Sequence, residues 1–422
     1  MSPGTRQTFR SLRVRNYRLF AGGQVVSLTG TWAQRIAQDW LVLDLSGNRG
    51  LALGVVTALQ FLPVLVLGLW GGVLADRYDK RRMLVGVQVA MGALALVLGL
   101  LDVTGLVQLW HVYALSFALG TASALDTPVR QAFVVELVGP DDLPNAVSLN
   151  SATFNSARIV GPAVAGVLIA TVGTGWVFLG NAVSFVAVVT GLLLMRVEDL
   201  RTPQRVEKAK GQVREGIAYV RGRPDLLVPI ALVAVVGTFG LNFQITMALI
   251  AKQVFGRGAG SFGLLTSALA LGSLLGALAS ARRTGPPRLR RLFGSALAFG
   301  LLEVLVGLAP SYAVMVVLLV PTGIAVLTFT TTANTLVQLG SAPHVRGRVM
   351  ALYVLVFLGG TPFGAPLIGA VAETMGPRSG LLLGGVISAL GAVAGAWYLA
   401  RRTAVTVEPH LLRRHPHVHV RA

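Results

Sequence analysis

Long apolar runs alternate with short polar and basic stretches along the whole chain, and this pattern decides the fold class. Crossing the hydrocarbon core of a membrane takes about 20 mostly apolar residues, because lipid offers no partner for exposed peptide groups. Such runs predict twelve transmembrane helices, at residues 19–43, 52–75, 83–101, 110–127, 146–172, 176–195, 226–250, 261–281, 289–308, 312–333, 349–372 and 378–400. We therefore expect an all-α membrane protein.

Composition supports this interpretation. Of the 422 residues, 54% are hydrophobic and only 13% are charged, whereas a soluble domain carries about 25% charged residues. The net charge of +19 is spread between the apolar runs, as in loops beside an anionic leaflet, so it does not indicate nucleic acid. The chain has no cysteine, which excludes a disulfide framework and thiolate ligands. We expect no metal site and no cofactor.

The distribution of lysine and arginine predicts the orientation. With the N-terminus inside, the cytoplasmic loops and tails hold 30 of these residues and the opposite side holds 4. Cytoplasmic loops of membrane proteins carry this excess of positive charge. We therefore expect a multi-pass protein of the plasma or inner membrane, in contact with the lipid bilayer, monomeric, with both termini in the cytoplasm.

The longest polar stretch divides the twelve spans into two sets of six, and each set is expected to form a bundle beside a central cavity. A shift of 203 positions lays Gly120, Pro140, Gly166 and Gly173 on four residues of the same type in the second half, which indicates a parallel repeat. The expected domains are a cytoplasmic tail at 1–18, a six-helix bundle at 19–195, a linker with an amphipathic helix at 196–225, a second bundle at 226–400 and a disordered tail at 401–422.

The loop after the second span carries a motif with a clear spacing. Gly72 is followed by Asp76 and Arg77, and then by a basic cluster that includes Arg81. This motif resembles the loop signature of the major facilitator superfamily. Gly72 would let two helices approach closely, Asp76 could cap the third helix, and the arginines could clamp a neighbouring helix. The resemblance implies a conformational latch; the alternative is ordinary positive charge on the inner side.

The fifth span holds a second motif, in which Arg158 precedes Gly161, Pro162 and Gly166. It resembles, in shortened form, the antiporter motif of exporting families, and the alternative is a simple proline kink. Together with the stretches 34–41, 128–132 and 214–225, it is similar to the enterobactin-exporter-like and macrolide-efflux-like branch of the drug exporters. The fourth span lacks the buried arginine that many proton–drug antiporters carry there. In this respect the chain departs from the family pattern, and a standard proton relay is not expected.

Charged residues inside a membrane span are costly, so each is a functional candidate. Arg35 and Asp39 are four residues apart on the first helix and share a face with Gln38. Arg158 lies near the middle of the fifth span. The sequence leaves two roles open for this group: lining a cavity where substrate or proton binds, or forming a structural ion pair between helices one and five.

Other polar residues extend the set of candidates. Asn155, Asn242 and Gln244 lie within or at the ends of spans, where they suit the wall of a cavity. Glu303 in the ninth span is a candidate for coupling, or a residue of the outer vestibule. Near the inner end of the fourth span, Asp126 is expected to orient Arg130 or to cap a helix.

We expect a secondary active transporter that works by alternating access, without enzymatic activity. A small amphipathic molecule, such as a drug, a siderophore or a natural product, is the expected substrate. The chain has no ATP-binding loop of the P-loop type, so ATP hydrolysis is not the expected driving force. The family resemblance implies export driven by the proton gradient. The alternatives are uptake of a metabolite or siderophore by the same architecture, and a membrane sensor or assembly partner that transports nothing.

Overall fold

The computed structural model describes residues 9–201, 212–282 and 287–402, without the side chains at 69, 71–73, 75, 76, 212–216 and 402. Nearly all of this part of the chain is helical. The first half comprises η1 (Arg10–Arg13), α2 (Arg15–Ser46), α3 (Gly50–Arg77), α4 (Lys80–Val103), α5 (Leu109–Val172), α6 (Thr174–Leu193) and η2 (Val197–Asp199). The first helix begins at Arg15, inside the segment that the sequence assigned to the tail.

The second half is built from shorter pieces. It comprises α7 (Gln212–Arg221), α8 (Pro224–Val235), η3 (Val236–Gly240), α9 (Phe243–Leu249), η4 (Ile250–Val254), α10 (Ala259–Ala281), α11 (Leu289–Gly307), α12 (Tyr312–Gly340), α13 (Arg346–Gly359), α14 (Thr361–Met375) and α15 (Ser379–Arg402). The segments η3 and η4 are π-helical. The α7 helix packs on α8 and α13, and its Val220 is buried in the core of the second half.

The helices correspond to the expected spans. In the described ranges, nine helical stretches are long and apolar enough to cross a membrane. One of them is α5, whose 64 residues turn in the middle at Gly139 (φ 72°) and therefore supply two spans. That backbone conformation is rare for residues with a side chain, which explains the glycine. With α2 and α11 added, the arrangement is consistent with twelve predicted spans.

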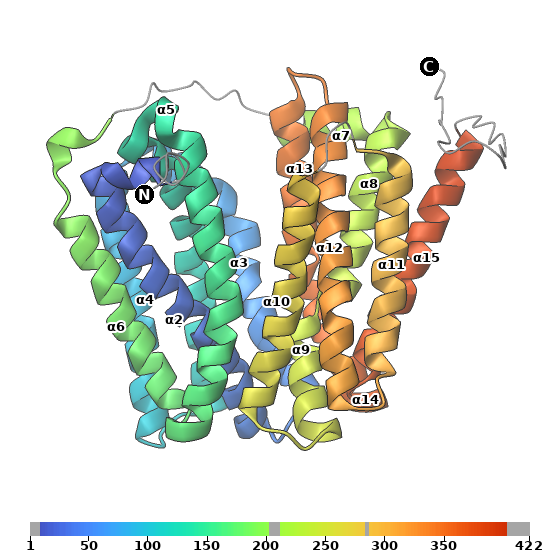
Figure 1. Cartoon of the computed structure of the whole chain (residues 1–422), viewed down its shortest axis with the longest axis horizontal. Helices are drawn as coiled ribbons and strands as arrows, with labels where there is room; N and C mark the ends of the chain where they lie inside the picture. The colour runs from blue at the N-terminus through green and yellow to red at the C-terminus, as the bar shows by residue number, and fades with distance from the viewer. Residues whose placement is uncertain (1–8, 202–211, 283–286, 403–422) are drawn as a thin grey trace.

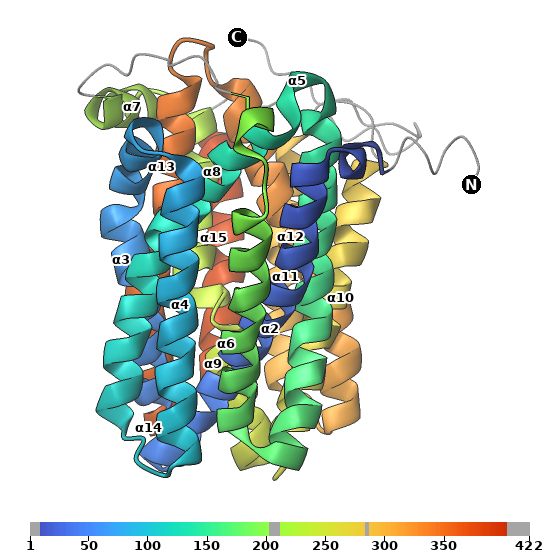
Figure 2. The same cartoon turned by 90° about the vertical axis from the view of Figure 1, so that its left-hand side faces the viewer.

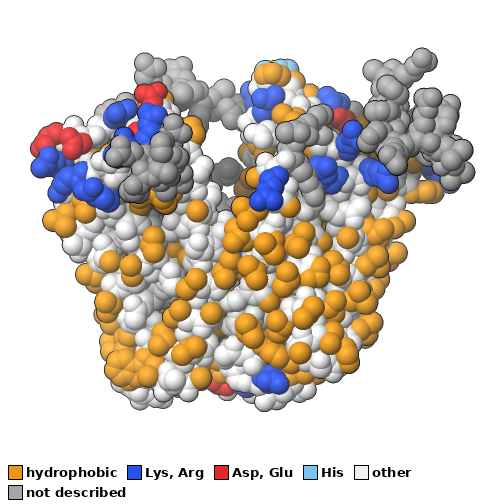
Figure 3. Space-filling view, in the orientation of Figure 1, with side chains coloured by type: hydrophobic (Ala, Val, Ile, Leu, Met, Phe, Trp, Pro, Cys, Tyr) orange, Lys and Arg blue, Asp and Glu red, His pale blue; other side chains and the backbone are white. Residues whose placement is uncertain are grey.

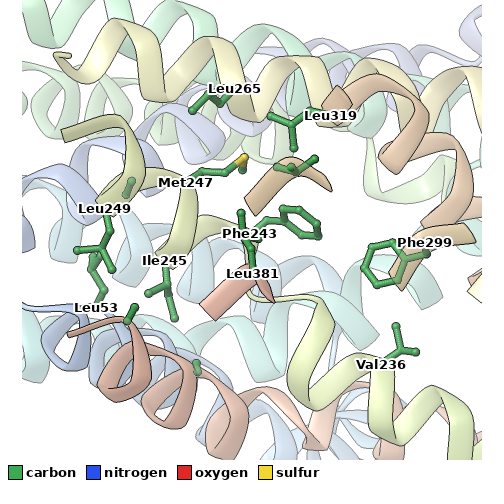
Figure 4. Packing of buried hydrophobic residues seen from close by; sticks show 14 of the residues in the cluster. Leu53, Val236, Phe243, Ile245, Met247, Leu249, Leu265, Phe299, Leu319 and Leu381 are labelled. Atoms are coloured by element: carbon green, nitrogen blue, oxygen red, sulfur yellow. The ribbon is translucent and has the colours of Figure 1, made fainter. Parts of the chain in front are cut away.

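The two halves form two helical bundles that stand side by side (Figure 1). Turned by 90°, the first bundle shows α4 and α6 next to each other on its outer surface (Figure 2). Figure 4 shows part of the buried core of the second bundle, where Phe243 of α9 and Phe299 of α11 have ring centroids 6.0 Å apart. Leu53 of α3 reaches the same core, so the bundles share apolar packing.

The repeat seen in the sequence has a structural counterpart. Gly120 of α5 lies against the backbone of α3, and its equivalent Gly323 of α12 lies against the backbone of α10. Gly166 of α5 meets α10 in the other half, and Gly369 of α14 meets α3. Because equivalent glycines make equivalent close contacts, the two bundles are related by a pseudo-repeat that exchanges α3 with α10, the first part of α5 with α12 and its second part with α14.

The bundles touch tightly at one end only. We call the end where α2 begins and α15 ends the terminal end, and the opposite one the far end. At the far end, a Cβ atom added to Gly54 would lie 2.5 Å from the carbonyl oxygen of Ala365, and one added to Gly166 would lie 2.7 Å from Cα of Gly260. At the terminal end the surface is hollowed between the bundles (Figure 3).

Polar contacts add to this closure. Asp44 at the end of α2 forms an ion pair with Lys252 of η4, and Gln253 Nε2 donates to the carbonyl oxygen of Asn48 at 2.7 Å. The side view also shows apolar side chains over the flanks of both bundles, while most lysines and arginines in view gather at the terminal end (Figure 3). This surface suits a protein surrounded by lipid.

Candidate functional site

A cavity with a volume of about 310 Å³ lies between the bundles. Its walls combine residues of both halves, with apolar, aromatic and hydroxyl side chains around a single charged one. Its lining consists of Trp32, Arg158, Leu241, Phe243, Gln244, Met247, Thr266, Leu269, Ala270, Ser273, Val326, Leu327, Thr330 and Phe357. A mostly apolar concave site with a few polar groups is typical of small-molecule binding.

Arg158 is the only charged side chain among the described residues that line this cavity. Its Nη2 donates to Ser273 Oγ of α10 at 2.8 Å, a contact that crosses from one bundle to the other. A guanidinium has five N–H donors, and within the described ranges no carboxylate lies close enough to Arg158 to form an ion pair. The cavity therefore contains a cation that no carboxylate of the described ranges compensates.

The structure separates Arg35 from Arg158. Arg35 Cζ lies 4.9 Å from the ring centroid of Trp32, and its side chain lines a smaller cavity of about 60 Å³ inside the first bundle. Gln38 lines the same small cavity and donates to Ser116 Oγ of α5 at 3.0 Å. Trp32 lines the large cavity, so it separates the two arginines.

Asp39 is buried, with 7% of its surface exposed, and its Oδ2 atom has no hydrogen-bond partner. Among the described residues, no arginine or lysine lies within ion-pair distance of it. Arg158 does not pair with Asp39 in this conformation, so the structure does not show the ion pair between helices one and five that the sequence left open.

The amides predicted to line the cavity are in different environments. Gln244 lines the large cavity. Asn242 instead donates to the backbone oxygen of Thr238 at 2.8 Å, next to the break between η3 and α9. Asn155 is half-buried and donates to the backbone oxygen of Ser151, within its own helix.

Two further predicted residues form a network near the terminal end. Asp126 pairs with Arg130 at 3.0 Å, as one alternative in the sequence analysis proposed, and also accepts from Gln88 Nε2 of α4 at 2.7 Å. Arg130 in turn donates to Gln24 Oε1 of α2 at 2.9 Å. The network joins three helices of the first bundle.

The loop motif is seen only in part. The packing around Gly72 and the side chain of Asp76 lie outside what the structure describes, although both positions belong to α3. The N-cap of α4 in the described part of the chain is Asp79, whose Oδ1 accepts from the backbone N–H of Arg82 at 2.7 Å. An aspartate three residues before the amide it accepts from has the ordinary capping geometry.

The arginines of this loop differ from each other. Arg81 donates from Nε to the carbonyl oxygen of Leu192 at 2.7 Å and from Nη2 to that of Leu193 at 2.9 Å, so it holds the end of α6. Positive charge at the last carbonyl groups of a helix is favourable. Arg77 is exposed to solvent. Arg81 thus contacts a neighbouring helix of its own bundle, and its role in a conformational latch stays a prediction.

The motif in α5 packs two helices closely. A Cβ added to Gly161 would lie 2.5 Å from Trp32 Cβ of α2, and the carbonyl group of Pro162 faces Gly263 of α10. Together with Gly166, these residues let α5 contact α2 in its own bundle and α10 in the other one. The motif therefore forms part of the surface on which the bundles meet.

Sequence reasoning missed several cavity residues. The ring of Trp32 lies beneath the guanidinium of Arg35, Ser273 accepts from Arg158, and Met247 and Thr330 also line the large cavity. Trp32 is three residues before Arg35, which is a helical spacing and a usable signal. Ser273 and Thr330 lie in long apolar runs that contain many small residues, so nothing in the sequence singles them out. Among the described residues, no cluster of three metal-ligating side chains is present.

A helical arrangement consistent with twelve spans, in two related bundles around a cavity, is the fold of the major facilitator type. Solved structures share it: a bacterial homolog of the human lysosomal transporter Spinster, inward-facing and unoccupied, has a TM-score of 0.71 at 16% identity over 92% of this chain and 97% of that chain. The nucleoside transporter NupG has a TM-score of 0.71 at 13% identity, over 90% and 98%. These likenesses show the fold alone.

The chain matches the family described as transmembrane secretion effector over residues 6–419, and it belongs to this family of the major facilitator superfamily. It is 24% identical to the staphyloferrin A transporter of Staphylococcus aureus over 85% of this chain and 89% of that protein. It is 28% identical to the multidrug efflux pump Tap of Mycolicibacterium fortuitum, over 81% and 85%. The enterobactin exporter EntS of Shigella boydii is 27% identical, over 80% and 82%.

These findings confirm the resemblance stated from the sequence. The protein is a multi-pass membrane transporter, and its family and relatives are transporters rather than enzymes.

Proposed function

We propose that this transporter exports an amphipathic small molecule that carries a negative charge, using the cavity around Arg158 as its binding site. The uncompensated guanidinium of Arg158 carries this proposal. A cation in a poorly solvated cavity attracts an anion strongly and, with a planar fork of donors, suits a carboxylate, sulfonate or catecholate. The surrounding Trp32, Phe243 and Phe357 supply surface for an aromatic or apolar body.

Export is supported by two observations. The relatives include proteins named as an enterobactin exporter and a multidrug efflux pump. The hollow between the bundles also opens at the terminal end, where the lysines and arginines gather (Figure 3). If the positive-inside rule holds for this chain, that end is cytoplasmic and the cavity here is loaded from inside the cell. The localisation we propose is the plasma or inner membrane, with a monomeric transporter whose termini are both cytoplasmic.

The driving force we propose is the proton gradient. Asp39 and Glu303 are buried carboxyl groups within spans, and each has one oxygen without a hydrogen-bond partner. Such groups are costly to keep charged in a membrane and are suited to exchange protons. The transporter would alternate between the conformation described here and one that is open at the far end.

A matched pair of probes tests the substrate class. Uptake into inverted membrane vesicles is measured for anionic 1-anilinonaphthalene-8-sulfonate and for neutral N-phenyl-1-naphthylamine, with and without a protonophore. We expect proton-dependent uptake of the anion, and a loss of about tenfold or more in its kcat/KM for Arg158→Gln, since losing one charged hydrogen bond costs roughly 1.5–3 kcal/mol.

Arg282→Gln, at an exposed position, is the control. Equal handling of both probes by the wild type and by Arg158→Gln would contradict the proposal. Counterflow in right-side-out vesicles separates export from uptake.

A further inference from the structure

The seventh membrane segment is interrupted near its middle. It runs through α8 and the π-helical η3, breaks at residues 241 and 242, and continues in α9 and η4. Asn242 donates to the carbonyl oxygens of Thr238 and Phe239, at 2.8 and 3.3 Å. Irregular backbone at this depth is tolerated where protein covers it, and π-helical turns often occur at functional sites.

Glu303 of α11 lies directly behind this break. Only 1% of its surface is exposed. A Cβ added to Gly240 would lie 3.2 Å from Glu303 Oε2 and 2.7 Å from Ser388 Oγ. A Cβ added to Gly384 would lie 2.8 Å from Glu303 Oε1 and 2.5 Å from the carbonyl oxygen of Phe239. Because Gly240 and Gly384 have no Cβ atom, the carboxyl group of Glu303, the hydroxyl group of Ser388 and the carbonyl group of Phe239 can converge in this space.

Two polar atoms in this space are unsatisfied. Neither Glu303 Oε2 nor Ser388 Oγ has a hydrogen-bond partner, and Ser388 is fully buried at 0% exposure. A neutral carboxyl group could donate to Ser388 or to Phe239, whereas a carboxylate would only accept. The edge of the Phe299 ring also borders this space, 2.8 Å from the Cβ position of Gly240, and it carries no charge that could compensate a carboxylate.

No cation faces Glu303 in the described part of the chain. The elements packed on α11 are η3, α12 and α15, and on these four elements the described titratable side chains lie near the ends: Arg290, Arg291, Tyr312, Tyr398 and Arg401. Arg378, before α15, donates to the carbonyl oxygen of Ala309. A carboxylate buried without a cation is expensive in a membrane, so this conformation accommodates the protonated form of Glu303.

The segment beyond the break closes the far end. Leu249 of α9 lies 3.1 Å from the position of a Cβ on Gly50, in the other bundle. Three residues further on, Lys252 of η4 pairs with Asp44 across the same interface. A change in how the break packs on Glu303 would therefore move the residues that hold the two bundles together.

We propose that Glu303, with Ser388 and the carbonyl group of Phe239, forms a proton-binding site in the second bundle, and that a proton bound there favours the conformation closed at the far end. Loss of the proton places a charge behind the break, which α9 accommodates by moving away and admitting water. The proposal deepens the proton coupling proposed above, and rests on it for its role in transport. A proton fits this site because it needs one acceptor, whereas a metal ion needs a fuller shell of oxygens.

Distances between spin labels test this inference directly. Because the chain has no cysteine, pairs of cysteines can be placed at Arg49 and Val254 at the far end, and at Asp141 and His344 at the terminal end. All four positions are exposed. Distance distributions are recorded in lipid nanodiscs between pH 5.5 and 8.5, in potassium buffer. We expect the far-end distance to lengthen as the pH rises, with up to a tenfold change in the ratio of open to closed molecules per pH unit for a single proton.

Two variants assign the effect to this site. Glu303→Gln cannot lose a proton, so the far-end pair should stay short over the whole pH range. Ser388→Ala keeps the carboxyl group but removes a partner, and should shift the midpoint of the pH response without abolishing it. Melting temperatures show whether each variant is folded, and Ser388→Ala keeps the test valid if Glu303→Gln is unstable.

Two results of the distance measurements would contradict the proton site. A wild-type pH response in both variants, or a far-end distance that does not depend on pH in the wild type, would overturn the site. A distance that responds to added Na⁺ at constant pH and not to protons would show a metal-ion site instead. Because the readout is conformation, it is independent of substrate. A failed transport assay would refute the proposed function, and only these distances would refute the proton site.

Discussion

The carboxylate of Glu373, near the end of α14, accepts a hydrogen bond from the backbone N–H of Leu51 in the first turn of α3, with Oε2 3.0 Å from the nitrogen. The two residues belong to different bundles. A helix has unpaired N–H groups and partial positive charge at its start, and a carboxylate there is stabilising. Because the contact joins the two bundles at the far end, we expect it to favour this conformation and to break when that end opens.

Removing this carboxylate should shift the conformational equilibrium. A charge at an exposed helix start contributes about 0.3–1 kcal/mol, so Glu373→Ala should raise the ratio of open to closed far ends by roughly two- to fivefold. Glu373→Gln, which keeps an acceptor oxygen but loses the charge, should have a smaller effect. The measurement is the spin-label distance between positions 49 and 254. An unchanged distribution in Glu373→Ala would show that the contact contributes nothing to closure.

Gly54 provides a steric test of the same interface. A Cβ at this position would lie 2.5 Å from the carbonyl oxygen of Ala365 and 2.6 Å from Cα of Pro366, and neither backbone atom can move independently. Gly54→Ala should therefore separate α3 from α14 and hinder closure of the far end. Trapped in the open state, the variant should transport at least tenfold more slowly while remaining folded.

Gly68, in the same helix, is the matched control, because nothing lies within 4 Å of its Cβ position. Gly68→Ala should keep the wild-type transport rate and gain slightly in helix stability. If Gly54→Ala closes and transports as the wild type does, the close approach of α3 and α14 is not required for turnover.

The membrane orientation can be measured on whole cells. The distribution of arginine and lysine predicts that the terminal end is cytoplasmic. A single cysteine at Arg49, at the far end, should react with an impermeant maleimide added outside, and one at His344, at the terminal end, should react only after the membrane is permeabilised. Both side chains are exposed, so burial does not limit the reaction. The reverse pattern would invert the topology and with it the proposed direction of transport.

Much of the architecture could be predicted from the sequence because each span must satisfy its peptide groups internally, which imposes a length and a composition that are easy to read. The repeat was visible through glycines such as Gly166 and Gly369, since close helix contacts require small residues. The break between Gly240 and Asn242 was not predictable. It lies within a continuous apolar run, and what stabilises it is packing against α11 and α15.

The site was predicted less well, for a related reason. Sequence identifies costly residues such as Arg158 and Glu303, but not what they contact. The partner of Arg158 is Ser273, 115 positions away, and Glu303 faces a buried helix break and not an outer vestibule. The loop motif showed the same limit, because the sequence offers two aspartates near one helix start, and the capping contact of Asp79 is seen only in the backbone geometry.

The last prediction concerns Asp39. It is buried on α2, one of its oxygens has no hydrogen-bond partner, and no cation in the described ranges forms an ion pair with it. If it were a structural ion-pair partner, Asp39→Asn would leave a buried arginine unpaired and cost about 3–5 kcal/mol of stability. The absence of such a pair in this conformation predicts the opposite: Asp39→Asn should melt within a few degrees of the wild type.

Transport assays on the same variant should then separate proton-driven accumulation from exchange of substrate. The amide keeps the size and hydrogen bonding of the carboxyl group but cannot exchange a proton, so accumulation driven by a pH gradient should be lost while exchange of substrate across vesicles persists. Melting temperature, probe binding and pH-driven uptake are measured on one preparation. A stable variant that still accumulates substrate with the wild-type pH dependence would exclude Asp39 from coupling and leave Glu303 as the remaining carboxyl group to test. A variant that unfolds would instead show that Asp39 gains a structural partner in the conformation open at the far end.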